Sequence, residues 1–155
     1  MSRNVLPALT RPGRRSAPGS GAAASVADPT VSPFSTAVGS MFTALRGAMG
    51  IPVTYTRGGD SVQVTATPGQ TSFEIDDGSG LLIESSASDW IIAVDALILA
   101  GVKATPKRGD RITRTLNGKT LIYEIMGFGG EKAARTSDNH GHAWRVHSRL
   151  IEEFT

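Results

Sequence analysis

Four residues near the end of the chain have side chains that could hold a metal ion: Asp138, His140, His142 and His147. Imidazole and carboxylate groups suit zinc, but the spacing of these four residues matches no closed zinc signature. A polar loop followed by an exposed strand face explains them without any ligand. The sequence therefore predicts no metal site and no cofactor.

Other candidate chemistry is equally unsupported. Glu84, Asp89 and Glu124 lie among expected strand residues, where nothing pairs them as general acid and base, so we expect carboxylates that face solvent. The serine cluster at 85–88 lacks the glycine spacing of a nucleophile elbow. The segment GFGGEK (127–132) is a poor match to a phosphate-binding loop. These observations predict that the protein is not an enzyme.

Length and composition favour a single β-rich domain. A chain of 155 residues is about one domain long, and its 18 glycines and 8 prolines indicate many turns. The absence of cysteine excludes disulfides, thiolate catalysis and cysteine-ligated metals. A formal net charge of +2 permits contact with nucleic acid but does not indicate it.

Residues 1–31 form a separate segment, an extended basic arm rich in proline and glycine. Regular structure is prevented by Pro7, Pro12, Pro18 and Pro29. Four arginines face only Asp28 as a counter-charge, so the arm is either a solvated tail or a contact for a polyanion or an acidic partner. It lacks the apolar stretch of a secretory signal, whereas a transit peptide stays possible. The longest apolar run, 90–101, is too short for a membrane span, so we expect a soluble protein.

An amphipathic helix is predicted directly after the arm. Ser32 is a suitable N-cap, Pro33 suits the first helical position, and Gly50 marks the end. Apolar residues recur at helical spacing between them, at Phe34, Val38, Met41, Phe42, Leu45 and Met49.

Short strands separated by turn signals follow the helix. Gly58-Gly59 and Asn117-Gly118 each have the spacing of a tight hairpin turn, and 72–76 pairs with 80–85 around an acidic turn. The segment 89–99 is a buried strand followed by a turn or, as the alternative that periodicity alone does not separate, a short helix, and 142–151 is a final strand. We therefore predict a mainly β domain over 32–155, a small antiparallel β-barrel or sandwich with one N-terminal helix. Its predicted core is Val53, Tyr55, Val64, Ile92, Val94, Ile112, Ile125 and Val146.

The order of several short segments resembles a known family. The segments are GIPVTYTRGGDSVQVTATPG (50–69), SSASDWIIAVDALIL (85–99), ATPKRGDRI (104–112), LIYEIM (121–126) and WRVHSRLI (144–151). Their succession, from about Phe42 to Ile151, resembles the head-tail connector proteins of long-tailed DNA bacteriophages. The proline-rich first third has no counterpart in that family, and only Ser137-Asp138 remains of a Trp-Ser-Asp-like element in the loop 130–141.

The resemblance implies a structural protein of the virion neck. Copies would form a hexameric or dodecameric ring around the DNA channel, with the portal or an adaptor protein above, tail proteins below, and packaged DNA passing through. Assembly would take place in the host cytoplasm, without a membrane. Candidate contact residues are Arg11, Arg14, Arg15, Asn117 and Lys119, and candidate channel-facing residues are Asp76, Asp77, Glu131 and Lys132.

Two other interpretations stay open at this point. One is a tail-terminator ring protein. The other is a small β-barrel module that binds nucleic acid, although exposed aromatic residues between cations, which such modules use for stacking, are scarce. Its basic face would consist of Arg111, Arg114, Lys119, Arg145 and Arg149.

Overall fold

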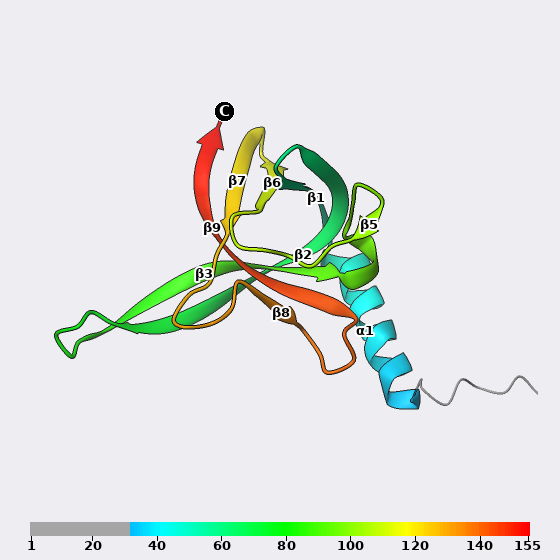
Figure 1. Ribbon diagram of the computed structural model, residues 1–155, viewed down its shortest axis with the longest axis horizontal. Coiled ribbons are helices and arrows are strands. Elements are labelled where there is room, and N and C mark those ends of the chain that lie inside the picture. The colour runs from blue at the N-terminus through cyan, green and yellow to red at the C-terminus, as the bar shows by residue number, and fades with distance from the viewer. Residues whose placement is uncertain (1–31) are drawn as a thin grey trace, which may run out of the picture.

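The computed structural model describes residues 32–155 (Figure 1). The predicted arm, with Arg11, Arg14 and Arg15, lies outside these described residues. The described part consists of one helix, a short 3-10 turn and nine strands. In chain order they are α1 (Pro33–Met49), β1 (Ile51–Arg57), β2 (Asp60–Asp76), β3 (Leu82–Ala93), η1 (Val94–Ala96), β4 (Ile98–Leu99), β5 (Val102–Lys103), β6 (Arg111–Leu116), β7 (Lys119–Ile125), β8 (Ala134–Thr136) and β9 (Ala143–Phe154).

Seven strands form one antiparallel sheet in the order β3-β2-β1-β6-β7-β9-β8. The long strand β9 pairs with β7 through its second half and with β3 through its first half. The sheet therefore curls back on itself, with β9 joining its two sides (Figure 1). This arrangement confirms the predicted mainly β, barrel-like or sandwich-like fold with one N-terminal helix.

Both predicted two-residue turns are present. Gly58-Gly59 connects β1 to β2 with Arg57 opposite Asp60, and Asn117-Gly118 connects β6 to β7 with Leu116 opposite Lys119. Asn117 has φ 52° and Gly118 φ 77°. Positive φ values at both central positions are what this class of hairpin turn requires, and asparagine and glycine adopt them most readily.

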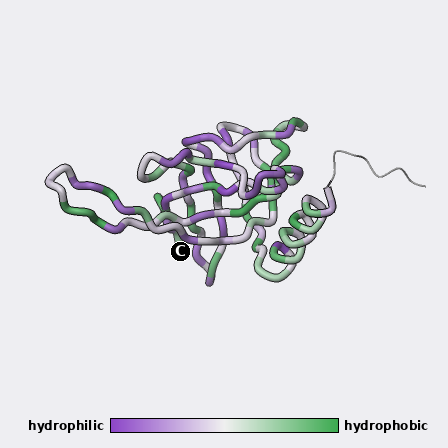
Figure 2. The backbone as a smooth tube through the Cα atoms, turned by 90° about the horizontal axis from the view of Figure 1, so that it is seen from below, coloured by the Kyte–Doolittle hydropathy of each residue, from purple (hydrophilic) through white to green (hydrophobic). Residues whose placement is uncertain are grey.

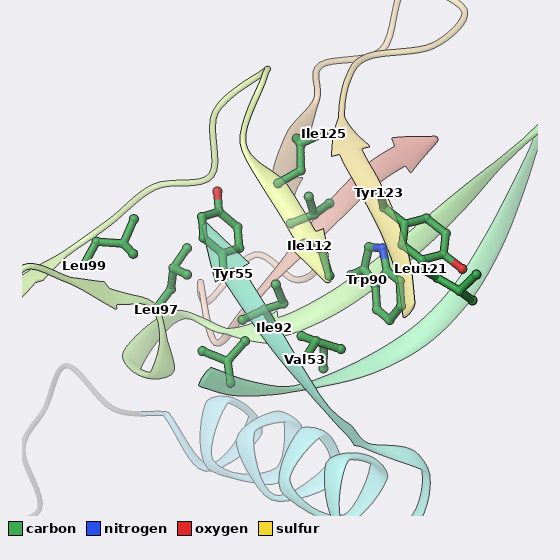
Figure 3. Packing of buried hydrophobic residues seen from close by; sticks show 13 residues of the cluster. Val53, Tyr55, Trp90, Ile92, Leu97, Leu99, Ile112, Leu121, Tyr123 and Ile125 are labelled. Atoms are coloured by element: carbon green, nitrogen blue, oxygen red, sulfur yellow. The ribbon is translucent and has the colours of Figure 1, made fainter. Parts of the chain in front are cut away.

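The core lies inside the curled sheet (Figure 3). Seven of the eight predicted core residues are buried, and Leu97, Leu99, Leu121 and Trp90 join them. The Trp90 ring meets the Tyr123 ring edge-on, with 5.1 Å between the ring centres. The prediction for Val94 is wrong: this residue is only half-buried, because the chain leaves β3 after Ala93 and turns into η1.

Strand β2 is longer than the sequence pattern suggested. The pattern ended one strand near Pro68-Gly69 and began another at Ser72, whereas β2 runs without interruption through both. Pro68 follows Ala66, the last residue of β2 that pairs with β1, so this part of β2 is an edge strand, which tolerates proline. The ends of β2 and β3, residues 70–87, then continue away from the body as a two-stranded ribbon (Figure 1). We call these residues the projecting hairpin.

The helix begins and ends as predicted. The Ser32 hydroxyl accepts a hydrogen bond from the Ser35 N–H (3.1 Å), Pro33 occupies the first turn, and the Gly50 N–H donates to the Arg46 carbonyl (2.9 Å). A Cβ at Gly50 would lie 2.3 Å from that carbonyl oxygen, so only glycine fits there. No helix within 32–155 has the length and apolarity needed to cross a membrane.

Candidate interaction site

Over its outer half, the projecting hairpin has one apolar face that no other segment within residues 32–155 covers. Ile75 stands opposite Ile83, and strand alternation places Leu81 on the same side. The exposed fractions of these side chains are 38% for Ile75, 49% for Ile83 and 62% for Leu81. A two-stranded ribbon is marginally stable in water by itself. Its exposed apolar face is therefore a candidate surface for contact with another protein.

The opposite face and the tip of the hairpin are acidic. Glu74 stands opposite Glu84, and Asp76 stands opposite Leu82. Residues 70–87 contain four carboxylates and no lysine or arginine. Figure 2 shows this ribbon extending from one end of the body, with hydrophobic and hydrophilic residues interspersed along it.

Two aspartates shape the tip. The Asp76 carboxylate accepts a hydrogen bond from the Gly78 N–H (2.8 Å), and the Asp77 carboxylate accepts from the N–H (2.8 Å) and hydroxyl (2.6 Å) of Ser79. The bonds from Ser79 lower the pKa of the Asp77 carboxyl below its ordinary value. The tip is thus a defined turn that carries negative charge.

A buried ionic cluster holds the base of the hairpin. The Asp89 carboxylate lies 2.7 Å from His147 Nδ1 and accepts hydrogen bonds from Arg145 Nε (2.8 Å) and the Thr71 hydroxyl. Burial alone would raise the pKa of Asp89, but the hydrogen bonds from Thr71, His147 and Arg145 outweigh it and keep that pKa below its ordinary value. The cluster ties β2, β3 and β9 together where the ribbon leaves the body.

This cluster corrects two predictions. Asp89 and His147 were expected to face solvent, yet their exposed fractions are 1% and 0%. His147 does lie on the outer side of β9, as strand alternation requires, but the segment 126–133 covers that side, with the Glu131 carboxylate 3.7 Å from His147 Nε2. Its Met126 N–H donates to the His147 carbonyl, and the His147 N–H donates to the Ala133 carbonyl. Such a covering segment has no periodic signal in the sequence.

The covering segment also contacts the hairpin. The Phe128 ring stacks on the Phe73 ring, with 5.6 Å between centres, and Phe73 meets the His147 ring edge-on. Glu131 places a carboxylate oxygen 3.7 Å from His147 Nε2, a buried nitrogen without a hydrogen-bond partner, and 3.5 Å from Arg135 Nε. These contacts fix the root of the hairpin to the body.

A second buried carboxylate, Asp110, ties the loop before β6 to β1. It accepts hydrogen bonds from the Tyr55 hydroxyl, from Arg57 Nη2 (2.6 Å) and Nε (2.9 Å), and from the Lys107 N–H (2.9 Å). Burial and then the bond to Asp110 raise the pKa of Tyr55. Burial would raise the pKa of Asp110, but its bonds to Arg57, Tyr55 and Lys107 lower it overall.

The four residues with metal-binding side chains are divided between two places. Asp138 accepts hydrogen bonds from the N–H groups of His140 (3.1 Å) and His142 (2.9 Å), and its other contact, at 2.7 Å, is His142 Nδ1. His142 Nε2 lies 3.4 Å from the Ser35 hydroxyl on α1, whereas His147 belongs to the Asp89 cluster. Within residues 32–155, no three His, Asp or Glu side chains are arranged to hold a metal ion.

The helix carries the second exposed apolar surface, although its Phe34 ring lies 5.6 Å from the His140 ring. None of its residues is fully buried, and Phe34, Met41 and Met49 are more than half exposed. Arg46 is the single charged residue between Pro33 and Met49. A groove of about 480 Å³ runs between α1 and the end of β3. We call it the helix groove; its lining includes Phe42, Thr43, Leu45, Arg46, Ile91 and His142.

The predicted site residues lie in three separate places. Asn117 and Lys119 are at the exposed β6–β7 turn, where Lys119 Nζ pairs with Glu153 at 2.5 Å. Asp76 and Asp77 are at the hairpin tip, and Glu131 and Lys132 are in the covering segment. Sequence reasoning missed the apolar face of the hairpin. The sequence feature that marks this face is the alternation of apolar residues, namely Phe73, Ile75, Leu81 and Ile83. A strand that faces the core of its own domain has the same alternation.

Three of the five residues of the predicted basic face are engaged with other groups. Arg114 lies over the rings of Trp90 and Tyr123, at 5.6 Å and 5.5 Å from their centres. Arg145 pairs with Asp89 and Lys119 with Glu153. Arg111 and Arg149 both stand opposite Glu124, one on each neighbouring strand. These contacts give no support to a nucleic-acid-binding module.

Comparison with protein families gives a match over most of the chain. A sequence model of the family described as "Phage head-tail joining protein" matches residues 34–155, which contain every strand and nearly all of α1. A comparison with curated protein sequences finds no match.

Proposed function

Because the chain belongs to the phage head-tail joining protein family, we propose that it joins head to tail as one subunit of a closed ring around the DNA channel. Membership confirms the resemblance to head-tail connectors. It makes the protein a structural component of the phage neck, located in the virion at the head–tail interface and in contact with head and tail components. The ring and the identity of each neighbour are our proposal.

One observation supports the proposed ring: each copy exposes two different apolar surfaces, the hairpin face and the helix. A contact between two different surfaces joins copies head to tail, and such a chain closes into a ring when the rotation per copy divides a full turn without a rise. We propose six or twelve copies, assembled in the host cytoplasm, with the portal or an adaptor protein on the head side and tail proteins on the other.

The remaining candidate residues take roles within this ring. Asp76, Asp77, Glu131 and Lys132 would face the channel. Three of them are carboxylates, and a wall with few free cations does not retain DNA, because every phosphate neutralised by Lys or Arg adds affinity. Asn117 and Lys119 at the β6–β7 turn, with Arg11, Arg14 and Arg15 of the arm, would contact neighbouring proteins. No bond in any substrate is made or broken in this role.

Deletion of the gene from its phage tests the function. We expect filled heads and separate tails that fail to join, or heads that lose DNA, with joining restored by the wild-type gene supplied in trans. Native mass spectrometry of the purified protein and of isolated necks gives the copy number. Infectious tailed particles from the deletion would contradict the joining role, and a single copy per neck would contradict the ring.

A further inference from the structure

We propose that the apolar face of the projecting hairpin of one copy docks in the helix groove of the next copy. This inference rests on the proposed ring and names the contact that closes it. The hairpin and α1 extend from opposite ends of the same body in both views (Figures 1 and 2). The two surfaces cannot meet within one chain, so a second copy is the partner that brings them together.

The two surfaces match in chemistry. The hairpin contributes Ile75, Leu81 and Ile83, which are all at least 38% exposed. The groove offers the half-buried side chains of Phe42, Leu45 and Ile91. Its volume of about 480 Å³ is within the range of pockets that hold compact ligands, roughly 300 to 1,000 Å³, and gives room for side chains from a ribbon tip.

The charges match as well. Arg46 lines the groove and has no carboxylate within 4 Å among residues 32–155, its side-chain contact being the Thr43 hydroxyl. Asp95, also in the groove, is paired with Lys103 at 2.5 Å. The hairpin brings carboxylates and no cation. Asp77, at the tip, is bonded through its N–H to the Leu81 carbonyl and lies beside Leu81, so in this docking mode it would approach Arg46. The channel role proposed for the two tip aspartates would then pass to Asp76 alone.

Docking by this face leaves the other face of the hairpin uncovered. Glu74, Asp76 and Glu84 would then point away from the neighbouring copy. An acidic outer face repels the phosphates of passing DNA, which agrees with the channel role proposed for Asp76. The two faces of one ribbon thus serve two purposes, subunit contact and a wall that does not bind DNA.

Engineered cysteines test the contact, since the chain has none of its own. The double variant Leu81→Cys/Thr43→Cys should form a ladder of disulfide-linked multimers on a non-reducing gel, because each copy has one donor and one acceptor position. A mixture of the two single variants should stop at dimers. The matched double variant Leu81→Cys/Phe154→Cys, with its second cysteine at the far end of β9, should give no ladder. Equal ladders from both double variants would overturn the proposal.

A second test uses two neighbouring leucines with the same exposure. Leu81 and Leu82 are 62% and 61% exposed but lie on opposite faces of the ribbon. Leu81→Ser should weaken association of the copies by about tenfold or more, whereas Leu82→Ser should leave it near the wild-type value. Circular dichroism and thermal unfolding should show both variants folded.

The outcomes separate this contact from the ring itself. Rings that form equally well with Leu81→Ser and Leu82→Ser would overturn the docking mode while the proposed function stands. Necks that contain one copy would remove the ring and the docking together. If a cysteine introduced at Ser25 cross-links to Thr43→Cys and Leu81→Cys does not, the arm occupies the groove and the proposal is wrong.

Discussion

Strand β3 passes through two regions of the molecule that follow opposite rules. Its second half, from Ser88 to Ala93, lies in the body, where even the charged Asp89 is buried and fully partnered. Its first half, from Leu82 to Ala87, lies in the projecting hairpin, where apolar Ile83 is half exposed opposite Ile75. One strand thus buries a charge and exposes a hydrophobic side chain.

This difference indicates which region of the molecule depends on contact with other molecules. A buried charge is tolerated where hydrogen bonds replace its water shell, as in the body. The exposed apolar side chains of the projecting hairpin contribute little buried area to the fold of their own chain. Burial against another molecule in a complex explains why these side chains are apolar. Substitutions of buried residues should therefore change stability, and substitutions of exposed apolar residues in the hairpin or α1 should change assembly.

The largest effect is expected at the buried cluster. Asp89→Ala would leave His147 and Arg145 facing an empty position, and loss of one partner of a buried ion pair costs about 3 to 5 kcal/mol in the free energy of unfolding. Glu84→Ala, in the exposed half of the same strand, should change it by less than about 0.5 kcal/mol. Urea unfolding of the two variants measures both, and equal losses would erase the distinction between the regions.

The isoleucines of β3 give the next largest contrast. Ile92 is completely buried, and Ile92→Ala should cost about 2 to 5 kcal/mol through lost burial and the cavity left behind. Ile83→Ala should cost less than about 0.5 kcal/mol in the isolated protein, because this side chain is half exposed. Chemical denaturation gives both values. A cost for Ile83→Ala close to that for Ile92→Ala would mean that the hairpin packs on its own body.

The sequence predicted most of the body because its signals are local. Ser32-Pro33 and Gly50 bound the helix, Asn117-Gly118 fixes a turn, and period-two alternation identifies Val53, Tyr55 and Ile92 as core. Each of these depends on residues that are close together in the chain. The order of the connector-like segments then indicated the family that the comparison supports.

The errors have one physical cause, namely that alternation tells which residues share a face but not what covers that face. Asp89 and His147 lie on the face that alternation assigned to solvent, and the covering segment buries them. Ile75 and Ile83 have the alternation of core residues, yet no layer lies over them among the described residues. Which segment covers a face depends on contacts between residues far apart in the chain.

Acid should weaken the body in a defined direction. The pKa of Asp89 and that of Asp110 are lower in the folded protein than in the unfolded chain, so their contribution is complete above the unfolded value, about 3.9. It is lost as pH falls from there through the folded values. The free energy of unfolding should therefore decline below about pH 4.

Two variants test this assignment. Asp89→Asn, which cannot ionise, should reduce the acid-dependent decline, while Ile92→Val, destabilised by about 1 kcal/mol with both carboxylates kept, should retain the full decline. Urea unfolding between pH 3 and pH 6 provides the measurement. An unchanged decline in Asp89→Asn would show that the Asp89 cluster does not govern acid stability.

The smallest effect on stability is expected at an exposed side chain of α1. Met41 is 57% exposed, and methionine and glutamine are both good helix formers, so Met41→Gln should shift the free energy of unfolding by less than about 0.5 kcal/mol. Phe42→Ala is the matched variant one position on, at a half-buried side chain that lines the helix groove. It should cost more than Met41→Gln, because apolar area packed against the sheet is lost. Thermal unfolding of both variants gives the order. A larger loss in Met41→Gln would mean that Met41 is packed within the monomer, against the contrast between a self-sufficient body and exposed surfaces that contact a partner.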